Sequence, residues 1–486
     1  MIDIVADLHL HSKYSRAVSP QMTTPLMAHV AAQKGIELLA TGDWTHPVWF
    51  RELQANVEEA EEGLFKLKSQ TPSSKSQIQN PKSQNGTDEN RKEARFLLST
   101  EVATIFSQNG KGRRIHQLIF VPSFATAEKV NKELIKRGFN LSSDGRPIIG
   151  LSSKNLLSLL LEIDERSLLI PAHAWTPWFG IYGQMSGFNS LSEAFENLAP
   201  HVYGIETGLS SDPEMNWQVD ELRTRSILSF SDAHSLSKMG REATIFRLEN
   251  LSYENIRAAI MQPSLVSSHQ SLAKDQRQRA KDQVLYTIEF YPEEGKYHYS
   301  GHRNCKITMT PEEQEKANNM CPVCKRRLTD GVMRRVTELS QEKPRGLHKA
   351  NSKGLVWIAD PKNIHPPFVK IVPLQEIIAE AISRPVTSPK VKVIFDVLCE
   401  KGISEFHVLL HLSLDEISKI VATISSPEYA ARIRDGIQKV REEHIIIQPG
   451  FDGVFGTVKI WQEDNDVAKD TDESLNSAKE QIGLGF

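Results

Sequence analysis

Histidines and carboxylates gather at the ends of short apolar segments near the start of the chain. Residues 2–8 form the first such segment, which runs into Asp7-Leu8-His9-Leu10-His11. Side chains alternate between the two faces of a strand, so Asp7, His9 and His11 are expected on the same side. Imidazole nitrogens and carboxylate oxygens are ligands for transition metals such as zinc. A single His-x-His pair fits a structural role equally well. The metal-binding interpretation therefore depends on whether histidines and carboxylates recur at the ends of later strands.

The same residue types do recur along the first half of the chain. Those at or within later predicted strands are Asp43, His46, Glu101, His116, His173, Glu206, Asp232 and His234. If the strands run parallel, most of these side chains lie at one rim of a barrel, where barrel enzymes build their active sites. Each residue alone could be a hydrogen-bonded core histidine or a helix cap. Together they favour a site for several metal ions, with Glu101 as bridging carboxylate and phosphoester hydrolysis as the chemistry.

The elements that position these residues alternate between apolar and amphipathic segments, a pattern typical of an α/β fold. Strands are predicted at residues 2–8, 36–41, 97–104, 115–121, 168–172, 202–206, 227–230 and 243–248. Helices are predicted between them at residues 24–35, 127–138 and 153–162. Residues 67–95 are rich in Ser, Gln, Asn and Lys and predict a disordered insertion. We therefore predict a barrel domain over residues 1–270.

A second candidate metal site lies in a separate module, predicted over residues 271–345. Its two ligand pairs are His302-Arg-Asn-Cys305 and Cys321-Pro-Val-Cys324. Four soft or borderline ligands in two pairs are typical of a tetrahedral structural Zn²⁺ site. His298 or Cys399 could replace His302 as the fourth ligand, although Cys399 lies in an apolar helical pattern typical of a buried thiol. So few cysteines, with three of them grouped, predict a reducing, cytoplasmic compartment rather than a disulfide framework.

The remaining sequence predicts a mainly helical C-terminal domain over residues 346–461 and an acidic disordered tail over residues 462–486. The predicted helices span residues 374–382, 391–400, 403–410, 413–424 and 429–443, and an extended hairpin follows at residues 445–461. No apolar stretch reaches the length of about 18 residues that a membrane span needs. We therefore expect no membrane association.

The net charge of −3 hides a local basic segment. Residues 296–349 contain twelve Lys or Arg against six Asp or Glu. A basic metal-binding module beside a phosphoesterase-type barrel predicts contact with a phosphate backbone. The alternative is a solvated basic loop without a ligand.

Six short segments resemble motifs of the PHP (polymerase and histidinol phosphatase) family of metal-dependent phosphoesterases. They are DLHLHS, TGDWTH, STE, HQL, PAHAW and SDAH. The resemblance implies a PHP-type distorted (β/α)7 barrel that holds up to three metal ions. The metal contacts that it implies are His9, His11, Glu101, His116, His173, Asp232 and His234. Trp44 and Ala17 stand where family members have histidines. Asp43 or His46 are therefore candidates to complete the third metal position.

Four longer blocks, which begin at Glu206, Ser231, Pro292 and Pro449, resemble successive parts of the endonuclease Q family. The resemblance covers nearly the whole chain except residues 67–95 and the tail. It implies cleavage of single- or double-stranded DNA on the 5′ side of a deaminated base, such as uracil, hypoxanthine or xanthine, or of an abasic site. It also implies structural zinc, zinc in the barrel, Mg²⁺ or Mn²⁺ for catalysis, and replication or repair proteins as further partners.

For that activity, basic side chains would hold the DNA backbone, and a pocket would receive the flipped lesion. The candidates for backbone contact are Arg241, Arg303, Lys325, Arg326 and Arg327. Trp175, Trp178 and Phe179, just past His173, are candidates for the pocket, with simple core or lid packing as the alternative. Two other functions stay open: a PHP-type phosphatase of a small phosphomonoester, and a non-catalytic DNA-binding protein.

Overall fold

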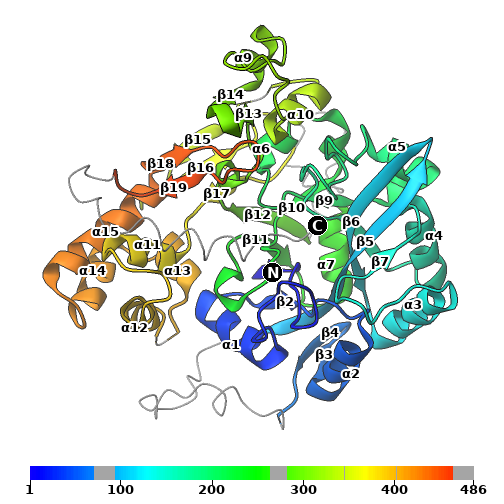
Figure 1. Ribbon diagram of the computed structural model, residues 1–486. Coiled ribbons are helices and arrows are strands. Elements are labelled where there is room, and N and C mark those ends of the chain that lie inside the picture. The colour runs from blue at the N-terminus through cyan, green and yellow to red at the C-terminus, as the bar shows by residue number, and fades with distance from the viewer. Residues whose placement is uncertain (70–92, 263–281, 344, 401, 463–486) are drawn as a thin grey trace, which may run out of the picture.

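The computed structural model describes residues 1–69, 93–262, 282–343, 345–400 and 402–462 (Figure 1). Most of the predicted insertion and nearly all of the predicted acidic tail lie outside these residues. Within the described ranges, no helix combines the length and apolar character needed to cross a bilayer.

All eight strands predicted for the first part of the chain are present. The strands of this part are β1 (Ile2–Asp7), β2 (Leu38–Ala40), β5 (Arg95–Gln108), β6 (Lys111–Val121), β7 (Ile148–Ile149), β8 (Leu168–Pro171), β9 (Gly204–Glu206), β10 (Ser226–Leu228) and β11 (Ala243–Leu248). A short hairpin, β3 (Val57–Glu61) and β4 (Leu64–Leu67), precedes the first gap and was not predicted.

Helices surround these strands. They are α1 (Thr24–Lys34), α2 (Pro47–Asn56), α3 (Phe124–Lys136), α4 (Ser153–Ile163), α5 (Leu191–Phe195), α6 (Pro213–Asn216) and α7 (Tyr253–Met261). Serine caps start several of them: the side chains of Ser123, Ser152 and Ser252 each accept a hydrogen bond from the backbone N–H three residues later. Figure 1 shows α3 and α4 on the outside of β5, β6 and β7.

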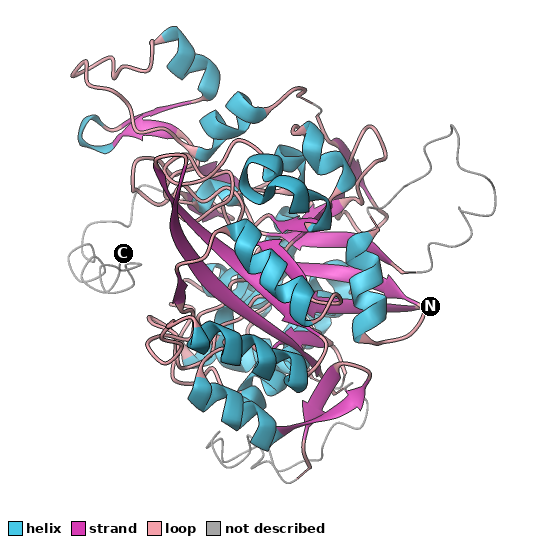
Figure 2. Cartoon of the chain, turned by 90° about the vertical axis from the view of Figure 1, so that its right-hand side faces the viewer, coloured by secondary structure: helices cyan, strands magenta, loops and turns pink. Residues whose placement is uncertain are grey.

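The strands are mixed in direction rather than all parallel. β1, β2 and β5 are parallel neighbours, and so are β9 and β10. In contrast, β5 and β6 form a long antiparallel hairpin, β6 pairs antiparallel with β8, and β1 pairs antiparallel with β11. The hairpin turns at Asn109 and Gly110, which both have positive φ, as a tight β-turn requires. Figure 2 views the molecule from this side and shows helices packed over the strands.

Alternation along the strands separates two apolar layers. Leu118 and Phe120 of β6 belong to a cluster that includes Ile256 and Ile260 of α7. Their neighbours Ile119 and Val121 belong instead to the larger cluster that includes helices α3 and α4. One face of each strand thus packs on the surrounding helices and the other fills the inside of the barrel.

The barrel sheet continues past the domain boundary that the sequence predicts at residue 270. β12 (Gln283–Glu289) pairs with β11, and β17 (Phe368–Lys370) pairs with β12. β16 (Val356–Ala359) and β15 (Leu347–Ala350) extend the same sheet. The Cys/His module projects from it, with β13 (Ser300–His302), β14 (Ile307–Met309), α9 (Pro311–Lys316) and α10 (Val332–Leu339).

The C-terminal part is helical, as predicted. Its helices are α11 (Leu374–Ala381), α12 (Pro389–Leu398), α13 (Glu405–Leu410), α14 (Leu414–Ala422) and α15 (Pro427–Arg441). The predicted hairpin follows as antiparallel β18 (Ile446–Gln448) and β19 (Thr457–Lys459). Its connecting loop packs on the Cys/His module, where the carboxylate of Asp452 accepts hydrogen bonds from the backbone N–H of Arg303 at 2.7 Å and from Thr329 Oγ1 at 2.6 Å.

Candidate metal centre at the barrel rim

His9 and His11 leave the end of β1 as fully buried side chains whose Nε2 atoms face the same carboxylates. His11 Nε2 lies 3.2 Å from Glu101 Oε2 and 3.2 Å from Asp232 Oδ1. His9 Nε2 lies 3.7 Å from Glu101 Oε2 and 3.5 Å from Asp232 Oδ1. The structure therefore brings the His-x-His pair together with residues about 90 and 220 positions later in the sequence.

Glu101 connects this pair to a second pair of histidines. Its Oε1 lies 2.8 Å from His116 Nδ1 and 3.1 Å from His173 Nε2, whereas Oε2 faces His11. A carboxylate with one oxygen directed to each histidine pair has the geometry that a ligand shared by two metal ions requires. This arrangement supports the bridging role proposed for Glu101 from the sequence.

The potential ligand atoms form three overlapping groups, within each of which all atoms lie within 4.8 Å of one another. The groups are His9, His11 and Glu101; His11, Asp232 and His234; and Glu101, His116 and His173. All seven metal contacts implied by the PHP resemblance are members. The groups share His11 and Glu101, so they form one continuous centre.

Buried polar atoms without partners test whether these residues fit a metal. Among the described residues, His9 Nε2, His11 Nε2 and Asp232 Oδ1 are buried and make no hydrogen bond. Leaving such atoms unsatisfied is costly in the absence of a ligand. Here they converge on one another, and a divalent cation would satisfy them together. The donor set therefore fits divalent metal ions.

Outer carboxylates fix the orientation of the two β1 histidines. Glu206 Oε1 lies 2.9 Å from His9 Nδ1, and Asp43 Oδ1 lies 3.1 Å from His11 Nδ1. A proton on each Nδ1 would donate to the carboxylate and leave Nε2 free to bind a metal. The metal contacts that the resemblance implies do not include Glu206, although its place at the end of a predicted strand is a signal for it.

Asp43 and His46, the two candidates for completing a third metal position, lie outside the three groups of described ligand atoms. The second oxygen of Asp43 accepts hydrogen bonds from the backbone and side chain of Ser12 at 2.6 and 2.7 Å. His46 is the N-cap of α2, and its ring stacks on Tyr14 at a centroid distance of 4.6 Å. Trp44 is fully buried in the core. Asp43 is therefore better placed to orient His11 than to bind a metal.

Three residues in or beside the candidate metal centre have a strained backbone conformation. Asp43, His173 and Asp232 have positive φ values of 49°, 29° and 47°. Few residues other than glycine adopt this region, and such strain concentrates at functional sites. Next to His173, Gly208 allows close approach, because a Cβ at this position would lie 2.4 Å from the His173 Cβ.

The charges in the site are strongly coupled. Burial acts to lower the pKa of His9 and His11, but the surrounding carboxylates outweigh it and raise both pKa values well above the ordinary value. Burial acts to raise the pKa of Glu101 and Asp232, but the neighbouring histidines, and Arg146 beside Glu101, hold both pKa values well below the usual range. Burial lowers the pKa of His116 to about 3, so this imidazole is neutral and able to bind a metal.

Arg146 also belongs to the centre and was not selected from the sequence. Its Nη1 lies 3.0 Å from Glu101 Oε2. It precedes β7 in a Gly-Arg-Pro turn that carries no metal-ligand motif. No sequence signal distinguished this arginine from the others.

The three aromatic candidates for a base pocket lie in different environments. Trp175 is a core residue, 1% exposed, whose Nε1 donates to Asn216 Oδ1 at 2.7 Å. Phe179 is half-buried and its ring lies 4.2 Å from that of His116. The Trp178 ring lies 5.3 Å from that of Tyr297, next to the Cys/His module. Trp178 and Phe179 therefore fit a pocket wall better than Trp175 does.

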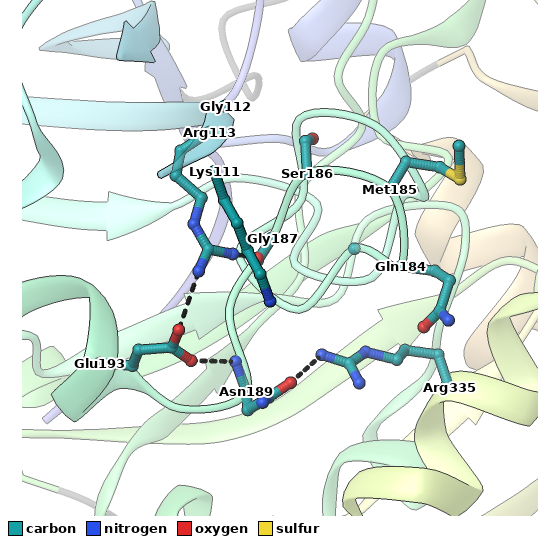
Figure 3. A pocket seen from close by; sticks show the side chains of 11 residues that line it. Lys111, Gly112, Arg113, Gln184, Met185, Ser186, Gly187, Asn189, Glu193 and Arg335 are labelled. Atoms are coloured by element: carbon teal, nitrogen blue, oxygen red, sulfur yellow. Dashed lines mark hydrogen bonds and ion pairs between the residues drawn. The ribbon is translucent and has the colours of Figure 1, made fainter. Parts of the chain in front are cut away.

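Two arginines fasten the loop that carries these aromatics (Figure 3). Arg113 of β6 donates to the carbonyl of Gly187 and pairs with Glu193 at 2.8 Å. Arg335 of α10 donates to the carbonyls of Tyr182 and Phe188, each at 3.0 Å, and to Asn189 at 2.7 Å. Both arginines line a polar pocket of about 410 Å³. The loop next to His173 is thus tied to both the barrel and the Cys/His module.

The predicted zinc ligands come together in that module. The ligand atoms of His302, Cys305, Cys321 and Cys324 all lie within 4.8 Å of one another, and His302 Nδ1 lies 3.4 Å from Cys324 Sγ. Burial acts to raise the pKa of Cys321, but backbone N–H groups and the neighbouring thiols lower it to about 7, which favours the thiolate. His302 therefore completes the four, rather than His298 or the buried Cys399.

The basic residues predicted to contact DNA are mostly exposed. Arg303, Lys325, Arg326 and Arg327 lie on the surface around the Cys/His cluster, and Arg327 pairs with Asp330 at 3.4 Å. Arg241 differs, because it is half-buried and its Nε donates to the carbonyl of Ser231 at 3.1 Å. That bond supports the loop that carries Asp232.

Comparisons with known proteins agree with this arrangement. Residues 373–443 match the family described as MJ0043 C-terminal domain. The chain is 27% identical over 310 residues to the uncharacterized protein MJ0043 of Methanocaldococcus jannaschii, and this match covers 61% of the chain and 33% of that relative. It is 26% identical to the uncharacterized protein YqxK of Bacillus subtilis, over 94% of the chain and 100% of the relative. The chain thus spans about a third of the length of the first curated relative and all of the second.

Two solved structures resemble the chain over almost its whole length. The lesion-specific endonuclease PfuEndoQ from Pyrococcus furiosus matches with a TM-score of 0.71 and 27% identity, over 98% of this chain and 99% of that one. An endonuclease Q in complex with a 27-mer duplex that carries an abasic lesion at the active site matches with a TM-score of 0.71 and 25% identity, over 96% of this chain and 100% of that one.

The barrel and its rim of histidines and carboxylates form a candidate metal centre of the class that metal-dependent hydrolases use. The fold is similar to that of endonuclease Q over nearly the whole chain, and the resemblance inferred from the ordered sequence blocks is confirmed. The predicted α/β fold class, with a Cys/His module and a helical C-terminal part after the barrel, is confirmed as well.

Proposed function

We propose that the protein is a DNA repair endonuclease that hydrolyses the phosphodiester on the 5′ side of a damaged nucleotide. The substrates are DNA with deaminated bases, namely uracil, hypoxanthine or xanthine, and DNA with abasic sites. The observation that carries the proposal is the continuous centre around Glu101 in a chain that resembles endonuclease Q from end to end. The solved complex with an abasic duplex supports DNA as the partner.

The chain's own residues prepare the hydrolysis. Glu206 and Asp43 hold His9 and His11 so that both Nε2 atoms face Glu101 and Asp232. Divalent ions held there would supply an activated water and stabilise charge on the attacking and leaving oxygens. We propose Mg²⁺ or Mn²⁺ for turnover, with zinc in the Cys/His module and in part of the barrel centre.

Basic residues around the zinc cluster hold the DNA backbone in this proposal. Arg303, Lys325, Arg326 and Arg327 are exposed on one module, which the Arg335 contacts tie to the loop beside the metal centre. Phosphate contacts of this kind make affinity fall with salt. A lesion turned out of the duplex would meet Trp178 and Phe179, and mispaired or missing bases are easier to turn out than paired ones.

A nicking assay tests the proposal. End-labelled duplexes with one uracil, hypoxanthine, xanthine or abasic site are incubated with the protein and Mg²⁺ or Mn²⁺, beside an undamaged duplex. We expect a single nick 5′ to each lesion and none in the undamaged strand. Rapid hydrolysis of p-nitrophenyl phosphate without nicking would instead favour a small-molecule phosphatase. Tight binding without any hydrolysis would favour a DNA-binding protein.

A further inference from the structure

Arg146 places a positive charge against the carboxylate shared by both histidine pairs. Its Nη1 lies 3.0 Å from Glu101 Oε2, the same oxygen that faces His11 Nε2 at 3.2 Å. The Glu101 side chain is fully buried, whereas that of Arg146 is 22% exposed. Arg146 therefore joins the buried ligands to solvent, and within the centre the side chains of Asp232 and His234 are similarly exposed, at 23% and 25%.

The backbone around Arg146 is held in place. Asp144 Oδ1 accepts a hydrogen bond from the backbone N–H of Arg146 at 3.2 Å, and the Gly145 N–H donates to the carbonyl of Tyr14 at 3.0 Å. A Cβ on Gly145 would lie 2.4 Å from Asp43 Oδ2, so the turn packs directly on the carboxylate that orients His11. A charge fixed in this way needs little reorganisation to stabilise a charge that develops during a reaction.

The chemistry of phosphodiester hydrolysis gives this cation a role. A guanidinium has five N–H donors, so the bond to Glu101 leaves others for a ligand. Its planar fork matches the oxygens of a phosphate group. During hydrolysis the P–O bond to water forms, the P–O ester bond breaks, and negative charge increases on the non-bridging oxygens. An arginine at the edge of the metal centre is placed to stabilise that charge.

We propose that Arg146 is a catalytic residue that donates hydrogen bonds to a non-bridging oxygen of the scissile phosphate. The inference rests on the proposed function. Arg146 stays protonated throughout: water supplies the new oxygen on phosphorus, one of its two protons ends on the leaving oxygen by way of solvent, and the other stays on the new phosphate group or is released to solvent. The competing role is purely structural, in which Arg146 only holds Glu101 for metal binding.

Substitutions that remove or keep the charge separate these roles. Arg146→Met and Arg146→Lys are compared with Arg16→Met, a control whose side chain is 81% exposed and pairs with Asp144 in the neighbouring turn. For each variant we measure bound metal by mass spectrometry, the Kd for an abasic duplex, and the single-turnover cleavage rate. Arg146→Ala is assayed with and without added guanidinium ion, and circular dichroism checks that every variant folds.

If Arg146 contacts the phosphate, Arg146→Met keeps its metal and its Kd within about threefold but loses about 10² to 10³-fold in cleavage rate. Arg146→Lys keeps part of the rate, and guanidinium restores part of the rate of Arg146→Ala. A rate within threefold of wild type in Arg146→Met, or a loss matched by lost metal and not rescued by guanidinium, overturns the inference. Absence of nicking by the wild type would contradict the proposed function itself, and the two failures are therefore distinguishable.

Discussion

Glu206 Oε1 lies 2.9 Å from His9 Nδ1, and both side chains are buried. The other oxygen of the same carboxylate accepts the backbone N–H of His173 at 2.6 Å. One acid at the end of β9 therefore fixes a histidine at the end of β1 and the chain that follows β8. Glu206 thus fixes the ends of β1, β8 and β9 relative to one another, and it can do so without contacting a metal.

Replacing Glu206 tests this orienting role. Glu206→Gln should lower metal affinity of the barrel about 10 to 100-fold, the usual effect of losing a partner of a ligating histidine. Competition with a chromogenic chelator measures the affinity. Glu196→Gln, which affects an exposed pair with Lys154, is the control and should leave the affinity unchanged. Equal affinities in the two variants would contradict the role.

Replacing Asp43 gives a second test, because the result distinguishes a residue that orients His11 from a residue that binds the metal directly. Asp43→Asn should weaken metal binding about 10-fold or more while the number of ions bound at saturation stays the same. If Asp43 were itself a ligand, that number would fall. Metal content at saturation, measured by mass spectrometry on wild type and variant, distinguishes the outcomes. Asp3→Asn, which breaks an exposed pair with Arg247, is the control.

The Cys/His module should depend on a bound metal, which we propose is zinc, because ligand binding and local folding are coupled. Cys321→Ala should lose one zinc per chain and expose residues 300–339 to proteolysis while the barrel keeps its metals. Cys399→Ala removes the buried thiol of the C-terminal part and should keep the full zinc content. A Cys321→Ala protein with unchanged zinc would exclude Cys321 from the ligand set.

Glu289, buried beneath the rim, predicts a pH effect on stability. Burial raises its pKa from 4.5 to about 7, although Ser229, Thr287 and Thr207 donate hydrogen bonds to it. The folded chain thus favours the protonated form, and stability falls as pH rises from the unfolded pKa to the folded one. Between pH 4.5 and 8, Glu289→Gln should gain up to about 3 kcal/mol relative to wild type. Urea unfolding of the metal-free proteins measures it, and a pH-independent difference would contradict it.

Much of the fold was predictable because the barrel strands and the C-terminal helices carry strong periodic patterns. The long β5–β6 hairpin was missed, although Asn109-Gly110 is a strong signal for a tight turn. Its strands were predicted too short because their outer ends, such as Arg113 and Arg114, are polar. The alternating pattern is typical of parallel strands, but it contains no information on strand pairing.

The candidate site was predictable where the types and spacing of the residues indicate metal binding. His9 and His11 share a strand side, and each remaining candidate ligand follows or lies in an apolar segment. Asp43 has the same sequence signature as a ligand, and only its contacts with Ser12 and His11 indicate an orienting role. Arg146 has no signature, since its position depends on how the turn before β7 packs against residues 14 and 43. Tertiary contacts decide such roles.

The most direct test of the central claim is metal-dependent nicking of one abasic duplex by wild type and Glu101→Gln. Chelator-treated wild type should be inactive, and Mn²⁺ or Mg²⁺ should restore a single nick on the 5′ side of the lesion. Glu101→Gln should bind the duplex with similar affinity and remain inactive at every metal concentration, because both histidine pairs lose their shared carboxylate. Cleavage by the chelated enzyme, or by Glu101→Gln at a rate near that of wild type, would contradict the account.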